Sequence, residues 1–166
     1  SGGKIKFKNL RKINNERVGD IQVTSSKLKP IIASKKYYLN ATDEYPILFT
    51  IAALIKGKSS FTGISGLRNK ESDRIKEMQK ILRQIGIMSK FNKNKLVING
   101  SDRKDYSKKI IKVSNLGDHR ICMSSAVIAL LTGANAVIKN FETVGTSSPN
   151  FLKIIKSLGG KFEKKY

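Results

Sequence analysis

The sequence predicts an α/β fold in which the helices are buried and the sheets lie outside. Two segments, 42–57 and 117–131, have the length of helices and are apolar on nearly every face, so we expect both to be buried on all sides. Each lies between strand patterns and is followed by an amphipathic helix. The two buried helices start about 75 residues apart, as do the two amphipathic ones, which indicates an internal structural repeat.

This repeat suggests how the chain is organised. Its 166 residues suffice for one domain of ordinary size. Residues 1–3 resemble a remnant of cloning, and residues 4–166 are expected to form most of one domain. Within it, residues 4–40 supply part of a third copy, and the two fuller copies span residues 41–100 and 109–166.

The N-terminal segment 4–40 alternates apolar and polar residues in short runs, which is typical of strands. Asn14 and Asn15 mark a turn between two of them, and Pro30 marks a strand end or edge. The stretch 33–42 is polar and predicts a loop.

The first buried helix follows this loop. Thr42 or Asp43 fits its N-cap, Pro46 is tolerated in its first turn, and Gly57 is expected to close it. A short strand over 59–64 comes next.

The stretch 66–86 predicts one amphipathic helix that Gly86 ends. Its apolar stripe contains Ile75, Met78, Leu82 and Ile85, and toward the N-terminus the same stripe passes through Arg74 and Glu71. Buried charges are costly unless they are paired or used. One interpretation therefore aims both side chains into a pocket, and the other makes them an ion pair on a solvated first turn.

The second half repeats the order. The predicted elements are a hairpin of 87–91 and 95–100, a solvated polar stretch over 101–109, a strand over 109–113, the second buried helix, a strand over 134–141, an amphipathic helix over 147–160 and a closing strand over 161–166. Asp118 is expected to cap the buried helix and Gly133 to end it.

Composition limits the classes of function. Lys and Arg number 33 against 12 Asp and Glu, a formal charge of +21 that attracts nucleic acid, acidic lipid or anionic metabolites. The charge is spread without an arginine-rich run, which favours a small anionic ligand; a basic nucleic-acid-binding module remains the alternative. The single Cys122 excludes an intrachain disulfide and a cysteine metal site. The longest apolar run, 121–131, is about half of a membrane span, and no signal peptide is visible, so we expect a cytoplasmic protein that does not enter the membrane.

Charged residues gather where the buried helices begin. If the repeats stack, these N-termini meet on one side, and their free N–H groups attract anions. Arg120 opposes the helix dipole there, so an anionic ligand explains it better than stability does. Asp118 and Asp43 can also be plain N-caps, and His119 has no second histidine to make a metal site, so we expect no metal. The residues alone predict a site for a multiply anionic small molecule, with two arginines and a lysine as anchors and Asp43 and Glu71 as acids that handle protons.

The motifs KESDR, DEYP and GDHRI together resemble the 5-enolpyruvylshikimate-3-phosphate synthase family, in particular the bacterial branch that carries DEYP and SSxLK. The resemblance runs from VGDIQVTSSKLK to LGGKFE in family order. The sister enolpyruvyl transferase that acts on a UDP-amino sugar shares the fold but is not expected to show KESDR. The resemblance implies the enolpyruvyl-transferase-like fold, built from βαβαββ units with buried helices and outer sheets, and here incomplete.

The family is longer than this chain, which would be a C-terminal fragment, inactive without the N-terminal part of the same enzyme. The family transfers the enolpyruvyl group of phosphoenolpyruvate to the 5-hydroxyl of shikimate 3-phosphate and releases phosphate, without metal or organic cofactor, on the shikimate pathway to chorismate and the aromatic amino acids. It is the target of glyphosate. By resemblance the catalytic residues are Asp43 and Glu71, the substrate-binding residues are Lys70, Arg74 and Arg120, and the supporting residues are Asp118 and His119. Some members carry a lysine that touches phosphoenolpyruvate where this chain has Thr146, so that contact is absent or replaced.

Overall fold

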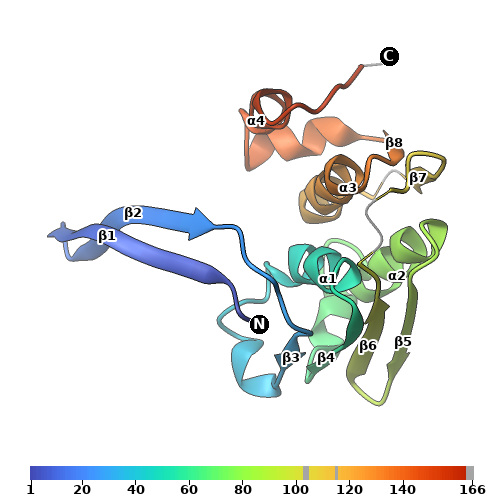
Figure 1. The fold of residues 1–166 in the computed structure, drawn as a ribbon, viewed down its shortest axis with the longest axis horizontal. Coiled ribbons are helices and arrows are strands. Elements are labelled where there is room, and N and C mark those ends of the chain that lie inside the picture. Colours follow the sequence, from blue (N-terminus) through green and yellow to red (C-terminus); the bar gives the residue numbers. More distant parts are fainter. Residues whose placement is uncertain (103–104, 115, 164–166) are drawn as a thin grey trace.

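The computed structural model describes residues 1–102, 105–114 and 116–163 (Figure 1). The strands are β1 (Lys4–Ile13), β2 (Glu16–Thr24), β3 (Ile32–Ala33), β4 (Gly57–Thr62), β5 (Met88–Asn92), β6 (Lys95–Gly100), β7 (Ile110–Val113) and β8 (Asn135–Ile138). The α-helices are α1 (Tyr45–Ala53), α2 (Arg74–Gln84), α3 (His119–Thr132) and α4 (Phe151–Ser157). Short 3₁₀ turns η1 (Lys35–Tyr37), η2 (Ser65–Asn69) and η3 (Phe141–Thr146) lie between them.

One unit of the fold occurs twice among the described residues. Strands β3 and β4 pair in parallel with α1 between them in the chain, and β7 and β8 pair in parallel with α3 between them. The amphipathic helix α2 follows β4, as α4 follows β8. The antiparallel hairpin β5–β6 completes a sheet of order β3-β4-β6-β5. The predicted α/β fold is thereby confirmed, while the boundaries assigned to the repeats stay a prediction.

Helices α1, α2 and α3 lie at the centre of the molecule. Helices α1 and α3 contact each other, and α2 contacts both, while α1 and α2 also cover one face of the four-stranded sheet (Figure 1). The core around α1 is aromatic: the rings of Phe49 and Phe61 meet edge to face at 4.9 Å, and Tyr45 lies 5.8 Å from Phe49. Edge-to-face packing of this kind fixes how α1 sits on β4.

The long helix predicted over 66–86 was wrong in its first half. Residues 65–69 form the turn η2, Lys70 is extended, and α2 begins only at Arg74. The break has a local cause, because the side chain of Asp73 accepts a hydrogen bond from the Lys76 amide and caps the helix there. Glu71 therefore lies before the helix rather than in its first turn. Gly86, with φ of 80°, follows the end of α2 as predicted.

Other boundaries also differ from the prediction. Helix α1 ends at Ala53, and Gly57, with φ of 118°, begins β4 instead of closing the helix. Glu44 occupies the N-cap position of α1 without a side-chain capping bond, so neither Thr42 nor Asp43 is the cap. The stretch 101–109 is not wholly solvated, because Tyr106 is only 3% exposed. Residues 161–163 form no strand, and the rest of the predicted closing strand, like 103–104, lies outside the described residues.

The two predicted hairpins are present. Asn14 and Asn15 connect β1 to β2 with φ of 47° and 68°, and Lys93 and Asn94 connect β5 to β6 with φ of 43° and 66°. Positive φ at both central residues is the requirement of a type I′ turn, and asparagine tolerates it better than most residues.

Gly100 is the position where this packing leaves no room for a side chain. A Cβ there would lie 2.1 Å from the carbonyl oxygen of Ala52 in the last turn of α1 and 2.2 Å from that of Ile55 just after the helix. We expect Gly100→Ala to lower the free energy of unfolding by at least about 2 kcal/mol, because backbone must move. Gly145→Ala is the control, since nothing lies within 4 Å of its added Cβ. Equal urea midpoints for the two variants would contradict this account.

Candidate functional site

The centre of the site is the guanidinium of Arg74, the first residue of α2. Its side chain is fully buried and bonds to three carboxylates from three parts of the chain. Nε donates to Asp118 at 3.0 Å, and the terminal nitrogens donate to Asp43 at 3.0 Å and Glu71 at 2.5 Å. Both interpretations from the sequence thus hold in part: the ion pair between Arg74 and Glu71 exists, and Arg74 is directed inward.

Asp118 joins the second half of the molecule to this cluster. Its Oδ1 accepts hydrogen bonds from the amides of Arg120 at 3.1 Å and Ile121 at 3.4 Å, so Asp118 caps α3 as predicted. Its other oxygen accepts from Arg74 and from the Ser72 hydroxyl at 2.9 Å. The carboxylate is fully buried. One side chain therefore starts α3 and neutralises the charge that α2 buries.

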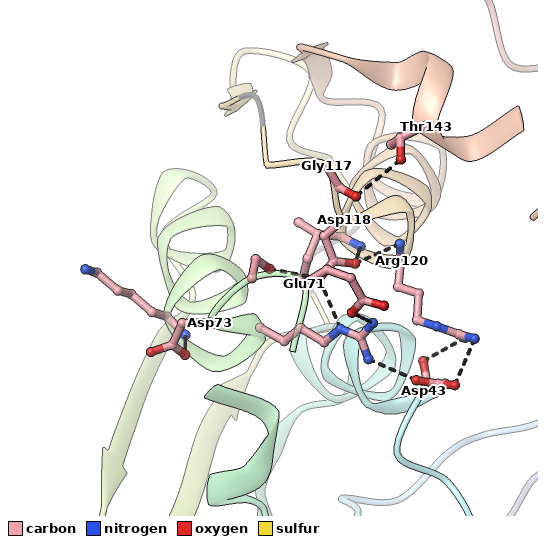
Figure 2. Close-up of polar contacts among 11 residues, drawn as sticks. Asp43, Glu71, Asp73, Gly117, Asp118, Arg120 and Thr143 are labelled. Carbon is pink, nitrogen blue, oxygen red and sulfur yellow. Dashed lines mark hydrogen bonds and ion pairs between the residues drawn. The ribbon is translucent and has the colours of Figure 1, made fainter. Parts of the chain in front are cut away.

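The outer part of the site pairs Asp43 with Arg120. The Arg120 guanidinium contacts the Asp43 carboxylate at 3.0 Å and donates to the Asp43 carbonyl at 3.1 Å. Asp43 is 47% exposed and Arg120 is 30% exposed, so both face solvent at the mouth of the cluster. Figure 2 shows Asp43, Glu71, Asp118 and Arg120 converging from separate segments. The positive charge of Arg120 is unfavourable in the first turn of α3, and the Asp43 carboxylate compensates part of it.

The other site residues predicted from the sequence lie near Asp43 and Arg120. Lys70 is exposed, and its charge acts on Asp43. Glu71 is 50% exposed with its carboxylate on Arg74. His119 is half-buried as the first residue of α3. The structure thus brings Asp43, Glu71, Arg74, Asp118 and Arg120 into one hydrogen-bonded cluster, and it places His119 beside that cluster without a described bond.

The charges of the cluster act on one another. The hydrogen bond from Arg74 lowers the pKa of Asp43 below its ordinary value of 3.8; partial burial opposes this, and the charges of Arg120, Arg74 and Lys70 add to it. Burial by itself would lower the pKa of Arg74, but the hydrogen bonds to Asp118 and Asp43 outweigh burial and raise it. Asp43 is therefore fully ionised at neutral pH.

Two supporting residues were not foreseen from the sequence. Ser72 bonds to Asp118, and Asp73 caps α2 while its carboxylate contacts Arg68 at 3.2 Å. The pair Ser-Asp before an apolar stripe is a capping signal that could have located the start of α2. Thr143 donates to the carbonyl of Gly117 at 3.2 Å, which ties η3 to the turn before Asp118 (Figure 2).

Two general features bear on the class of protein. Among the described residues, no three or more His, Cys, Asp or Glu side chains are grouped so that they could hold a metal ion. Within the same part of the chain, no helix has both the length and the apolar character to cross a membrane.

The fold is that of the enolpyruvyl transferases. NikO from Streptomyces tendae, an enolpyruvyl transferase, superposes with a TM-score of 0.59 at 12% identity over 95% of this chain and 33% of that one, a likeness that shows the fold alone. The EPSP synthase of Acinetobacter baumannii superposes with a TM-score of 0.84 at 28% identity, over 99% of this chain and 37% of that one.

The sequence comparisons identify the family. The family model of EPSP synthase (3-phosphoshikimate 1-carboxyvinyltransferase) matches residues 2–155. The 3-phosphoshikimate 1-carboxyvinyltransferase of Zymomonas mobilis is 37% identical over 164 residues, which cover 98% of this chain and 36% of that protein. The chain belongs to the EPSP synthase family, and it spans about a third of the length of the curated relatives it matches.

Removing Asp118 should be among the most damaging single changes at the site. Asp118→Ala leaves the buried Arg74 without its buried partner and uncaps α3, so we expect it to lower the free energy of unfolding by about 3–5 kcal/mol. Asp73→Ala is the matched control, because it removes the cap of α2 together with only an exposed contact to Arg68, and it should cost about 1 kcal/mol. Chemical denaturation measures both, and an equal loss would show that the bond to Arg74 adds nothing.

Asp43 should shape the acid limb of the stability curve. Because its pKa is lowered in the folded chain, its contribution is present above the unfolded pKa, near 3.8, and is lost as pH falls through the folded value. We expect Asp43→Asn to flatten the fall in unfolding free energy below about pH 4. Urea denaturation between pH 7 and pH 2.5 tests this, with Asp20→Asn in strand β2 as the control. Identical slopes for wild type and Asp43→Asn would refute it.

Proposed function

We propose that this chain is the C-terminal part of an enzyme that transfers the enolpyruvyl group of phosphoenolpyruvate to the 5-hydroxyl of shikimate 3-phosphate and releases phosphate. The observation that carries the proposal is the convergence of Asp43, Glu71, Arg74 and Arg120 at the start of three helices in a chain of this family. Both substrates carry phosphate and carboxylate groups, which suit the guanidinium groups and the helix N-termini that meet there.

The arginines and Lys70 are the proposed anchors for these anions. Arg74 uses three of its five N–H groups on the carboxylates of the cluster, so its plane is fixed and two donors remain. The Arg120 guanidinium is partly exposed and bonds only to Asp43 among the described contacts, so a phosphate or carboxylate can take the place of that partner. Guanidinium suits such two-pronged pairing better than ammonium. The bound anion would then sit between Arg120 and Lys70.

The same exchange prepares Asp43 for proton transfer. While Asp43 contacts both Arg74 and Arg120, its lowered pKa makes its carboxylate a weak base. When substrate anions occupy Arg120, Asp43 loses one of its cationic partners and its basicity rises, which suits the acceptance of a proton from the 5-hydroxyl. Asp118 supports Arg120 by capping the first turn of α3, and His119, the first residue of that helix, is the second proposed supporting residue.

The proposed chemistry is addition followed by elimination. The O–H bond of the hydroxyl breaks toward Asp43 while the oxygen bonds to C2 of the enol, and Glu71 gives a proton to C3. In the second step C3 returns the proton to Glu71, the double bond re-forms, the C2–O bond to phosphate breaks, and the departing phosphate takes the proton that Asp43 holds. Glu71 is 50% exposed and held by Arg74, a position from which it can reach an adjacent substrate. No metal or organic cofactor enters either step.

The setting of the enzyme is part of the same proposal. We place it in the cytoplasm, on the route to chorismate and aromatic amino acids, with glyphosate as a competitor at the phosphoenolpyruvate site. The N-terminal part of the enzyme completes the active site, so the 166-residue chain alone is expected to be inactive.

A chimera tests the function. The part of the Zymomonas mobilis relative that this chain does not match is fused ahead of it, and phosphate release from phosphoenolpyruvate with shikimate 3-phosphate is assayed, with the isolated chain as the blank. We expect turnover by the chimera alone. Glu71→Gln and Arg120→Ala should each reduce kcat/KM by about 100-fold or more, because each removes a group that acts on the transition state.

Exposed residues away from the cluster give the matched controls. Glu16→Gln in β2 and Arg83→Ala in α2 make the same changes of charge at exposed positions and should leave kcat/KM within about twofold. Losses below about tenfold in both site variants would remove Glu71 and Arg120 from the mechanism. Turnover by the isolated chain would contradict the proposal that the N-terminal part of the enzyme completes the active site.

A further inference from the structure

The segment 70–73, which carries Lys70 and Glu71, lies in neither a helix nor a strand. It joins the turn η2, which ends at Asn69, to α2, which begins at Arg74, and Lys70 has an extended backbone with φ of −103° and ψ of −162°. The backbone hydrogen bonds of a helix or strand therefore do not fix the direction of the Glu71 side chain. The proposed proton transfer to C3 needs that carboxylate in one place, because a misplacement of about 1 Å can cost about 100-fold in rate. Side-chain bonds must supply this constraint.

Among the described contacts, Ser72 is the residue of this segment whose side chain bonds to the second half of the molecule. Ser72 is half-buried, and its Oγ donates to Oδ2 of Asp118 at 2.9 Å. The same oxygen accepts from Nε of Arg74 at 3.0 Å, and a terminal nitrogen of Arg74 donates to the Glu71 carboxylate at 2.5 Å. These three bonds and the peptide unit between Glu71 and Ser72 form a closed ring, in which each member restrains the others.

The two carboxylates of this ring are held unequally. Asp118 is fully buried and would keep three N–H donors without Ser72, namely Nε of Arg74 and two amides in the first turn of α3. Glu71 is 50% exposed and would keep one described bond, from Arg74, in competition with water. The neighbouring carboxylate of Asp73 caps α2 instead. Loss of the Ser72 hydroxyl therefore loosens Glu71 more than it loosens the buried pair of Arg74 and Asp118.

We propose that Ser72 is a positioning residue for the proton transfer at Glu71, because its hydroxyl closes the ring that keeps the Glu71 carboxylate in place. The inference rests on the proposed function, and it gives Ser72 no contact with substrate, since Asp118 accepts the hydroxyl proton. Glu71 gives and takes a proton in successive steps, so it must keep one position while its charge changes. In the protonated form Glu71 is attracted less strongly to Arg74, and the bond from Ser72 to Asp118 then still holds the chain beside it.

Two variants of the same shape isolate the hydroxyl. In the chimera with the Zymomonas mobilis part, Ser72→Thr keeps the hydroxyl and Ser72→Val replaces it with a methyl group. We expect Ser72→Val to lower kcat about tenfold and to leave KM for phosphoenolpyruvate within about threefold, because Arg120 lies outside the ring. Ser72→Thr should keep kcat within about threefold. Thr62→Val makes the same exchange at an exposed position of β4 and should keep both constants within about twofold.

A double variant with Glu71→Gln separates a positioning role from a general structural one. If Ser72 acts through Glu71, Ser72→Val has nothing left to position once the carboxylate is gone. We expect the double variant to have a kcat within about twofold of that of Glu71→Gln alone. A loss of overall shape would instead multiply with the loss from Glu71→Gln and lower kcat by about tenfold more.

A measurement without substrate tests the ring itself. In the 166-residue chain, urea unfolding is compared for Ser72→Val, Glu71→Ala and both together. Members of one hydrogen-bonded ring depend on one another, so we expect the two effects to be coupled by at least about threefold in the unfolding equilibrium constant. Ser72→Val with Glu77→Ala is the control, because Glu77 pairs with Lys80 outside the ring, and its coupling should stay below about 1.5-fold. Circular dichroism confirms that each variant is folded.

Three results would overturn the role of Ser72. They are a Ser72→Thr chimera as slow as Ser72→Val, a double variant in which the two losses multiply, and the absence of coupling in the 166-residue chain. If the chimera turns over its substrates and Ser72→Val leaves kcat within about twofold, the role of Ser72 fails and the proposed function stands. If the chimera shows no turnover while the isolated chain shows the coupling, the ring around Glu71 is supported and the proposed function fails.

Discussion

The bond between Arg74 and Asp118 is the interaction on which the arrangement of the molecule depends. It joins the first residue of α2 to the cap of α3 at 3.0 Å, and both side chains are fully buried. A buried guanidinium costs several kcal/mol unless carboxylates compensate it, so the chain can adopt this packing only with both halves in register. The same bond leaves the outer donors of Arg74 directed at Asp43 and Glu71. Stability and preorganisation of the site therefore have one physical source.

Around this bond the charges are graded from interior to surface. Asp118 is buried and serves only protein groups, whereas Asp43, Glu71 and Arg120 are partly exposed and can exchange partners. The cluster holds three carboxylates and two guanidinium groups in contact, and Lys70 adds a nearby positive charge. A nearly neutral cluster of this kind stays folded without ligand, yet it offers cationic groups to an anion that displaces a carboxylate. The open groove lined by Ile47, Met123, Val127 and Phe151 adjoins Asp43 and Arg120. Exclusion of water from this groove would strengthen the charge interactions of those two residues.

Several local features were predictable because they depend on neighbouring residues. Asp118 before an apolar run and Gly133 after it define α3, and two asparagines in sequence define the turn of β1–β2. The start of α2 was predicted wrongly because helical periodicity was extended through Glu71, although Asp73 stops it with a capping bond. Asp43 looked equally like a cap; in the structure its carboxylate turns to two arginines that lie far away in the sequence. A carboxylate near a helix start can either cap the helix or pair with a distant arginine. The spacing of neighbouring residues in the sequence does not decide which of the two occurs.

By itself the sequence determined the α/β class, the repeated order of elements and the residues that carry charge at the helix starts, because periodicity and capping act within a few residues. Only the tertiary structure decided that Arg74 is buried, that Asp118 is its partner as well as a cap, and that the hairpin β1–β2 stands with its apolar face uncovered. These features depend on groups 30 to 80 positions apart in the chain, such as Asp43 with Arg74 and Arg120. Burial and pairing of charge are set by which elements meet in space, and no local pattern contains that information.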